Sequence, residues 1–162
     1  MTKFHPWFGL VARLILGGTL IAAGYLKFDE LDKSQMAVRA YELLPIPLAN
    51  FLGVVLPFFE LAVGILLVIG AGVRISAALS ALLMLAFMIG ISQAWARGLS
   101  IDCGCFGGGG QVAPGEADYL TPLLRDTGLA ILAIYLTFFP HSKFGLDKKP
   151  HTATQLGESA HG

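Results

Sequence analysis

The sequence predicts an all-α integral membrane protein, a bundle of four transmembrane helices with a short amphipathic surface helix in the first loop. Hydrophobic residues make up 55% of the 162 residues and charged residues only 14%. The mean hydropathy is +0.69, outside the balance of soluble domains. The apolar residues form four runs, which suit a bilayer core of ~30 Å. A soluble core is the alternative interpretation, but four such runs leave too few polar residues to coat a globule.

The first three apolar runs contain at most one charged residue each. Phe8 to Leu26 contains Arg13, Phe51 to Val73 contains Glu60, and Ile75 to Ala96 contains no charge. The N-terminal segment resembles a signal peptide because a lysine precedes its apolar run. Arg13 interrupts that run, however, and no clear A-x-A cleavage site follows. We therefore expect this segment to be the first transmembrane helix.

The fourth run, Leu120 to Phe139, carries Arg125 and Asp126 near its start. Only Thr127 to Phe139 is free of charge, and that stretch is shorter than the roughly 20 residues that a helix needs to cross a bilayer. The fourth span must therefore include both charged residues.

The first loop contains the stretch "SQMAVRAYELLP", in which apolar residues recur at helical spacing. Ser34 is a possible N-cap and Pro45 a stop, so we expect a short helix on the membrane surface. Pro47 and Asn50 then separate this helix from the second span. Pro57 lies inside that span and should kink it, with a neighbouring helix supplying a partner for the freed carbonyl.

An even number of spans places both termini on one side, together with the "GAGV" connection. The 27–48 and 97–119 loops then lie on the other side. Because positive residues collect in cytoplasmic loops, we expect cytoplasmic termini and an exoplasmic cysteine loop. The Lys and Arg count supports this five to four, with Lys3, Arg74, Lys143, Lys148 and Lys149 against Lys27, Lys33, Arg39 and Arg97.

Residues 1–140 form one membrane domain in this interpretation. Residues 141–162 are polar and lack periodicity, so we expect a disordered cytoplasmic tail. The formal net charge of +0 argues against a nucleic-acid partner. The glycines match neither nucleotide-binding loop pattern.

Ionisable residues at membrane depth should face the bundle interior and find partners. We expect Arg13 and Glu60 to form a structural ion pair between the first two spans; the alternative is Glu60 as a proton carrier or quinone contact. Arg125 should lie near the cysteine loop, where it could hold the loop or stabilise a thiolate. No bis-histidine haem is expected in the bundle, because the histidines fall outside the apolar runs: His5, His141, His151 and His161.

Both cysteines lie in "IDCGCFGGGG", one residue apart. Two thiols cannot complete a tetrahedral structural zinc site, and we expect no metal site. A disulfide between Cys103 and Cys105 would close a very small, strained and exchangeable ring. Gly104 would permit that geometry, and Gly107 to Gly110 would let a partner's backbone approach. Asp102 should disfavour a thiolate, so Arg97 or Arg125 would have to supply activation.

A redox pair is the preferred interpretation of the two thiols, and disulfides persist on the oxidising face of a membrane. Inert packing at a helix end and Cu(I) binding by a dithiolate remain as alternatives.

Ordered segments of the chain resemble a known family. "ARLILGGTLIAAGYLKF" is similar to the first helix of DoxX-like membrane proteins, with Arg13 and Lys27 matching its pattern. The later segments resemble the MauE branch, the methylamine-utilisation proteins, over roughly residues 9 to 139. These are "AYELLPIPLANFLGVVLPFFELAVGILLVIG", "DCGCFG" and "LLRDTGLAILA".

This resemblance implies a four-helix protein of the bacterial plasma membrane that acts beside an exported thioredoxin-like partner in disulfide chemistry. It implies Cys103 and Cys105 as the redox pair, with Glu60, Arg125 and Asp126 in support. The chain is also similar in outline to quinone-linked disulfide generators of the DsbB and vitamin K epoxide reductase type. Those relays use two cysteine pairs, so here a partner would supply the second pair, or a quinone would react directly.

We therefore expect a membrane thiol–disulfide protein that passes electrons between a thioredoxin-like partner and an acceptor such as quinone, with no other cofactor required. The alternatives are a non-catalytic accessory or assembly subunit of a larger membrane redox complex, and a Cu(I) carrier.

Overall fold

The computed structural model describes residues 5–106 and 108–140. Four described helices are long and apolar enough to cross a membrane, so the predicted four-span fold is confirmed. A short helix lies in the first loop and a two-stranded hairpin in the third. In chain order the elements are α1 (His5–Asp29), α2 (Leu31–Ala40), α3 (Ile46–Ile69), α4 (Val73–Ala96), β1 (Ile101–Asp102), β2 (Gly110–Gln111) and α5 (Leu120–Phe138).

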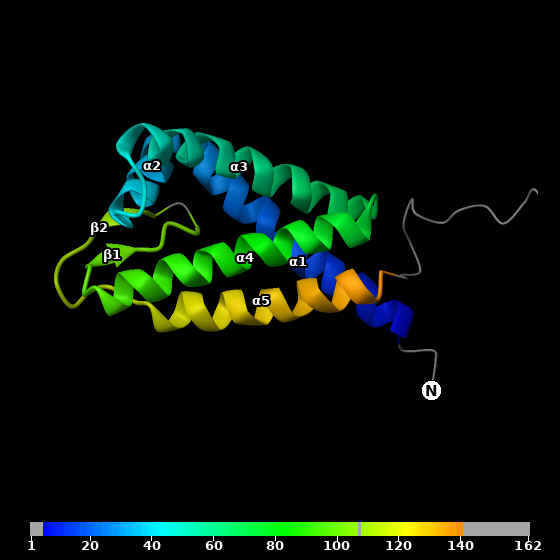
Figure 1. Ribbon diagram of the computed structural model, residues 1–162. Helices are drawn as coiled ribbons and strands as arrows, with labels where there is room; N and C mark the ends of the chain where they lie inside the picture. Colours follow the sequence, from blue (N-terminus) through cyan, green and yellow to red (C-terminus); the bar gives the residue numbers. More distant parts are fainter. Residues whose placement is uncertain (1–4, 107, 141–162) are drawn as a thin grey trace, which may run out of the picture.

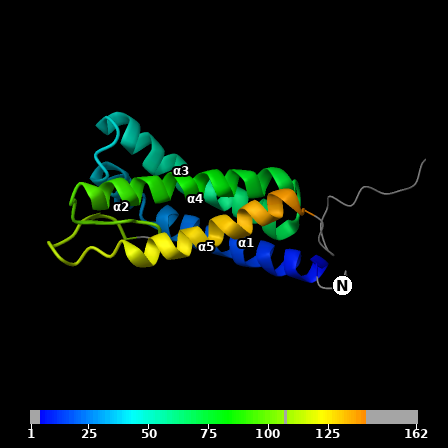
Figure 2. The same ribbon diagram turned by 60° about the horizontal axis from the view of Figure 1, so that its bottom comes forward.

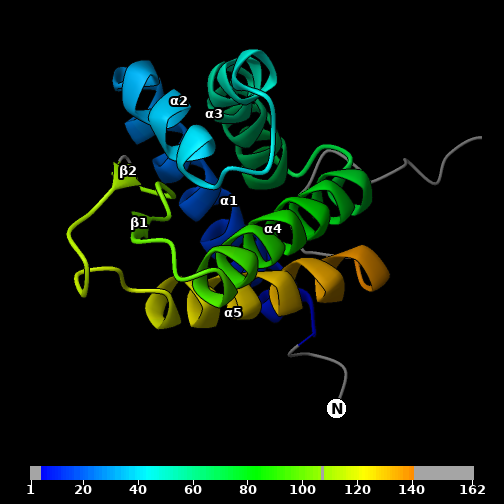
Figure 3. The same cartoon turned by 60° about the vertical axis from the view of Figure 1, so that its left-hand side comes forward.

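The long helices pack as two neighbouring pairs, α1 with α3 and α4 with α5 (Figures 1 and 2). The start of α1, the α3–α4 turn and the end of α5 lie at one end of the bundle (Figure 1). We call this the terminal end. At the opposite, loop end, α2 packs on α3, and the hairpin lies between α2 and the start of α5 (Figure 3). The predicted sorting of loops is thus confirmed, whereas its orientation in the cell stays a prediction.

The outer surface of the bundle is apolar on all four spans. Large hydrophobic side chains are exposed there, such as Leu14, Phe58, Leu82 and Ile131. A lipid-facing helix needs no polar outer face, because lipid tails are as apolar as these side chains. The polar groups are turned inward instead: Arg13, Glu60 and Asp126 are each 1% exposed.

The α1–α3 contact depends on glycine. A Cβ placed on Gly17 would lie 2.9 Å from the backbone oxygen of Gly64, and one on Gly64 would lie 2.9 Å from the oxygen of Gly17. Small residues let transmembrane backbones approach closely in this way. Any residue larger than glycine at position 17 or 64 would therefore push α1 and α3 apart.

The first loop differs in detail from the sequence prediction. The helix begins at Leu31 with Glu30 at its N-cap, so the prediction of Ser34 as N-cap is wrong. The Ser34 hydroxyl is buried and donates to the backbone oxygen of Gly53 at 2.7 Å. Pro57, four residues later, has no N–H to offer that oxygen. The predicted repair of the freed carbonyl by a neighbouring helix is thus confirmed, with α2 as the neighbour.

The second span starts earlier than expected. Pro47 lies in the first turn of α3, where its missing N–H costs nothing because first-turn amides have no helical partner. The helix of the second span therefore begins at Ile46. The predicted tail, residues 141–162, lies outside the described residues, as do His141, His151 and His161.

The predicted Arg13–Glu60 pair is wrong. The buried Arg13 guanidinium donates to the backbone oxygens of Leu67 at 2.9 Å and Val68 at 3.0 Å. These carbonyls belong to the last turn of α3, which ends in a left-handed Gly70. Terminal carbonyls lack helical partners and carry partial negative charge. Arg13 therefore caps the C-terminus of α3 at the terminal end of the bundle.

Candidate functional site

The cysteines lie in the turn of the β-hairpin at the loop end. Ile101 pairs with Gln111 and Asp102 with Gly110, in antiparallel register. The carboxylate of Asp102 accepts a hydrogen bond from the backbone N–H of Gly104 at 3.2 Å. Gly104 has a φ of +65°, a conformation that glycine adopts without strain. Asp102 and Gly104 therefore set the sharp turn between the two thiols.

The following glycines serve the chain's own packing. A Cβ on Gly109 would lie 2.5 Å from the Cβ of Ala37 in α2, and one on Gly108 would collide with a carboxylate oxygen of Asp102. Gly107 lies outside the described residues. Gly109 therefore lets the loop pack closely against α2, and the approach of a partner's backbone to this stretch stays a prediction.

Tyr41, which the sequence indicated only as part of an amphipathic face, anchors the turn. Its hydroxyl donates to the backbone oxygen of Cys103 at 3.1 Å, and its own backbone oxygen accepts from the Gln93 amide at 3.0 Å. Burial raises the pKa of Tyr41 above its usual range. It stays a neutral donor, and it ties the cysteine turn to the ends of α2 and α4.

The two thiols occupy unequal environments. Both cysteines are free; Cys103 is half-buried and Cys105 is 4% exposed. Hydrogen bonding from Cys105 lowers the pKa of Cys103 to about 7, with a further contribution from Arg125 and against the effect of burial. The same hydrogen bond and its own burial raise the pKa of Cys105. Cys103 is therefore the accessible thiolate of the pair, and Cys105 the protected thiol.

Arg125 and Asp126 place a charged pair beside the cysteine turn. The Arg125 guanidinium contacts a single Asp126 oxygen, Oδ1, with Nε at 2.9 Å and Nη2 at 2.8 Å. Its other side faces the ring of Phe106, 4.6 Å from the ring centre. This cation–π contact joins α5 to the residue that follows Cys105. The predicted proximity of Arg125 to the loop is confirmed.

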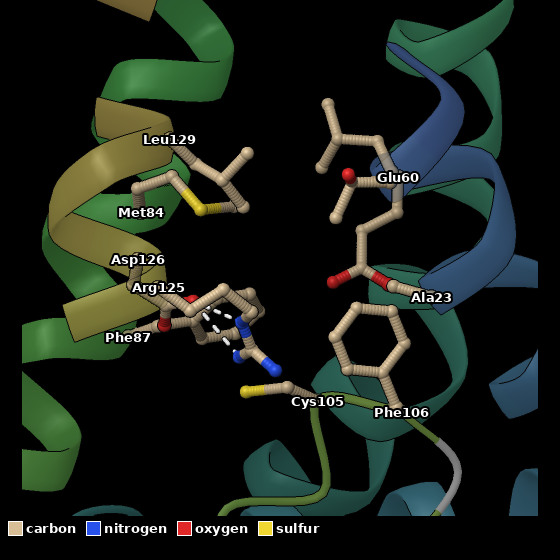
Figure 4. Close-up of a pocket in the computed structure, with 11 residues that line it drawn as sticks. Ala23, Glu60, Met84, Phe87, Cys105, Phe106, Arg125, Asp126 and Leu129 are labelled. Carbon is tan, nitrogen blue, oxygen red and sulfur yellow. Dashed lines mark hydrogen bonds and ion pairs between the residues drawn. The ribbon is translucent and has the colours of Figure 1, made fainter. Parts of the chain in front are cut away.

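A cavity of about 20 Å³ lies between the helices just behind Cys105. Figure 4 shows Arg125, Asp126 and Leu129 on one side, Ala23 and Glu60 on the other, and Cys105 with Phe106 closing one end. That volume is about the space of one water molecule. Of the predicted site residues, the cavity brings together Cys105, Glu60, Arg125 and Asp126.

The partner of Glu60 is Lys27, which the charge count assigned to the first loop and the family resemblance to the first helix. Helix α1 continues to Asp29, and the Lys27 ammonium lies 2.7 Å from Glu60 Oε1 and 2.9 Å from Oε2. Helical side chains lean toward the N-terminus of their own helix. In the antiparallel α1 and α3, Lys27 and Glu60 therefore lean toward each other, whereas Arg13 leans away from Glu60.

Metal ligands are sparse around this site. Within residues 5–106 and 108–140, no group of three or more His, Cys, Asp and Glu side chains comes together. The polar groups of the site are instead paired as acids with bases, and the two thiols stand at the edge of that arrangement. Such a site places the two thiols beside charged acid–base pairs, where protons can be exchanged between sulfur and carboxylate groups.

Comparison with known proteins gives one family. Residues 5–139 match the family described as "Methylamine utilisation protein MauE". No curated protein and no solved structure matches the chain.

Proposed function

From the premise that this chain belongs to the MauE family, we propose that it exchanges electrons between an exported thioredoxin-like protein and a membrane acceptor such as quinone, through Cys103 and Cys105. Family membership suggests a membrane accessory protein of methylamine utilisation. The thiol chemistry is the more specific step, and the observation that carries it is the unequal pair. One thiol is accessible with a pKa of about 7, and its neighbour is 4% exposed.

The proposed reaction begins at the Cys103 sulfur. In the oxidised protein, a thiolate of the partner attacks Cys103, and Cys105 departs and gains a proton. The partner's second thiol then attacks the mixed disulfide, so that the partner leaves oxidised and both cysteines are thiols. Two electrons and two protons pass from these thiols to the acceptor, which becomes a quinol when it is a quinone. Run backwards, the same steps reduce the partner.

The accessibility of the two thiols predicts which single variant captures the partner. Cys105→Ser leaves Cys103 without a resolving thiol, so its mixed disulfide should accumulate on a non-reducing gel and vanish with reductant. Cys103→Ser is the matched control: it leaves only the buried thiol and should capture much less. If Cys105→Ser captures no thioredoxin-like protein, and the double variant supports normal maturation of exported disulfide proteins, the accessory-subunit alternative takes the place of this proposal.

The same proposal requires the cysteine turn to face the oxidising side of the bacterial plasma membrane, with cytoplasmic termini. A membrane-impermeant maleimide, added to intact cells after mild reduction, should label Cys103 and spare Cys105. The Cys103→Ser variant should stay unlabelled under the same conditions. Labelling of Cys103 only after lysis would mean that the loop end is cytoplasmic.

A further inference from the structure

We propose that Asp126 takes the proton that Cys105 gives up and returns it, through the cavity between them. This inference rests on the proposed thiol exchange and adds a residue to its mechanism. It starts from one atom: Asp126 Oδ2 is buried, and no described residue hydrogen-bonds to it. Both contacts between Arg125 and Asp126 go to Oδ1. A buried carboxylate oxygen without a donor costs free energy, and such an exception calls for an explanation.

The position of Asp126 supplies that explanation. Asp126 and Cys105 both line the cavity of about 20 Å³, and in Figure 4 the two side chains reach it from α5 and from the cysteine turn. The space suits one water molecule, which needs two to four polar partners. Asp126, Cys105 and Glu60 are among the residues that line it and carry polar groups in their side chains. A proton can therefore pass between sulfur and carboxylate without reaching bulk solvent.

The charges around the cavity favour keeping that proton inside. The Lys27–Glu60 and Arg125–Asp126 pairs each sum to zero. A Cys105 thiolate would lie near the Arg125 guanidinium, but it would give a buried site with balanced ion pairs a net negative charge, which is costly. Transfer of the Cys105 proton to Asp126 leaves the total charge of the groups around the cavity unchanged. The charged and titratable groups around the site are Lys27 from α1, Glu60 from α3, Arg125 and Asp126 from α5, and Tyr41, Asp102 and Cys103 at the loop end, whereas α4 contributes Met84 and Phe87.

Each exchange step then balances. When Cys105 attacks a mixed disulfide on Cys103, the Cys103–Cys105 bond forms, the partner departs as a thiolate, and the Cys105 proton goes to Asp126. When a partner thiolate attacks the oxidised pair at Cys103, the Cys103–Cys105 bond breaks, and Asp126 returns the proton to the departing Cys105 sulfur. Asp126 is thus the general base of one direction and the general acid of the other.

The proton role of Asp126 can be tested by treating the purified, reduced protein with dithiobis(nitrobenzoate). This aromatic disulfide releases a coloured thiolate when a thiol attacks it. Attack by Cys103 releases a first equivalent, and attack by Cys105 on the resulting mixed disulfide releases a second. We expect Asp126→Asn to leave the first phase within about twofold and to slow the second roughly 100-fold near neutral pH, as for loss of general base catalysis. The deficit should shrink as pH rises, because hydroxide then removes the proton. Asp126→Glu should recover part of the rate.

The controls separate the possible outcomes. Asp118→Asn removes an exposed acid near the start of α5 that binds the Thr121 N–H, and it should leave both phases unchanged. An Asp126→Asn variant that slows both phases equally at every pH would show a structural role and overturn the proton role. A faster second phase would also overturn it, since Asp126 would then act only by repelling the thiolate. If the wild-type protein releases no second equivalent, the proposed thiol exchange fails; if wild type cycles and Asp126→Asn matches it, only the inference about Asp126 fails.

Discussion

Lys27 and Glu60 form a buried ion pair that joins α1 to α3, with Nζ 2.7 Å from Oε1 and side chains 6% and 1% exposed. Lys27 also lies over the ring of Phe87, 5.0 Å from its centre, which places α4 against the same pair. Glu60 also lines the cavity behind Cys105, so the integrity of the pair bears on both the packing of the bundle and the chemistry at its loop end.

We expect Glu60→Gln to destabilise the fold by about 3–5 kcal/mol, because it leaves the Lys27 charge buried without a counter-ion. Adding Lys27→Gln should cost less than the sum of the two single changes. Thermal unfolding and folded yield in detergent measure both. Arg13→Gln combined with Glu60→Gln is the matched comparison and should be additive, since Arg13 binds carbonyls of α3 instead. Coupling of Glu60 to Arg13 rather than to Lys27 would contradict this assignment.

Neighbouring glycines in α1 should differ sharply in their tolerance of alanine. A Cβ on Gly17 meets the Gly64 oxygen at 2.9 Å, whereas one on Gly18 meets nothing within 4 Å. Gly17→Ala should therefore push α1 from α3 and lower stability by about 1–3 kcal/mol, as overpacking does. Gly18→Ala should be neutral or stabilising by up to about 1 kcal/mol, because alanine is the better helix former. Equal melting temperatures for the two variants would refute the close α1–α3 contact.

The Ser34 hydrogen bond should matter only while Pro57 is present. Ser34→Ala leaves the buried Gly53 oxygen without its donor and should cost about 1–3 kcal/mol. In a Pro57→Ala background, residue 57 regains an N–H that can bond to the same oxygen, so the second loss should be smaller. A four-member thermal unfolding cycle measures the coupling. Identical costs in both backgrounds would mean that Ser34 does not replace the helical bond.

The reactivity of Cys103 should titrate near neutral pH. With a pKa of about 7, its thiolate and its alkylation rate should rise from pH 5 and level off above pH 8. Cys105→Ala removes the hydrogen-bond partner that lowers this pKa, so the midpoint should move toward the ordinary thiol value of about 8.5. Cys105→Ser keeps a hydroxyl donor and should shift less. Initial rates with iodoacetamide across this range give the midpoint. A midpoint that stays at pH 7 in Cys105→Ala would assign the shift to the backbone N–H of residue 105 and to Arg125 instead of the Cys105 side chain.

The candidate site was predictable in part. The sequence alone identified both cysteines, because two thiols on either side of one glycine are an unusual pattern. It also identified Arg125, because an arginine inside an apolar run is rare. The charge count assigned Lys27 to a loop because hydropathy does not mark helix ends, although the family resemblance matched it to the first helix; α1 runs on to Asp29. Tyr41 carried no signal apart from its helical spacing, although its hydroxyl holds the turn.

The sequence by itself determined the four spans, the loop that holds the thiols and the need for each buried charge to find a partner. These follow from local quantities: the length of an apolar run, the spacing of residues and the cost of a charge in lipid. Only the tertiary structure decided which partner each charge has. Arg13 and Lys27 lie on one helix, yet one caps α3 and the other neutralises Glu60. The direction in which helical side chains lean, and the register at which glycines let α1 and α3 meet, made that choice.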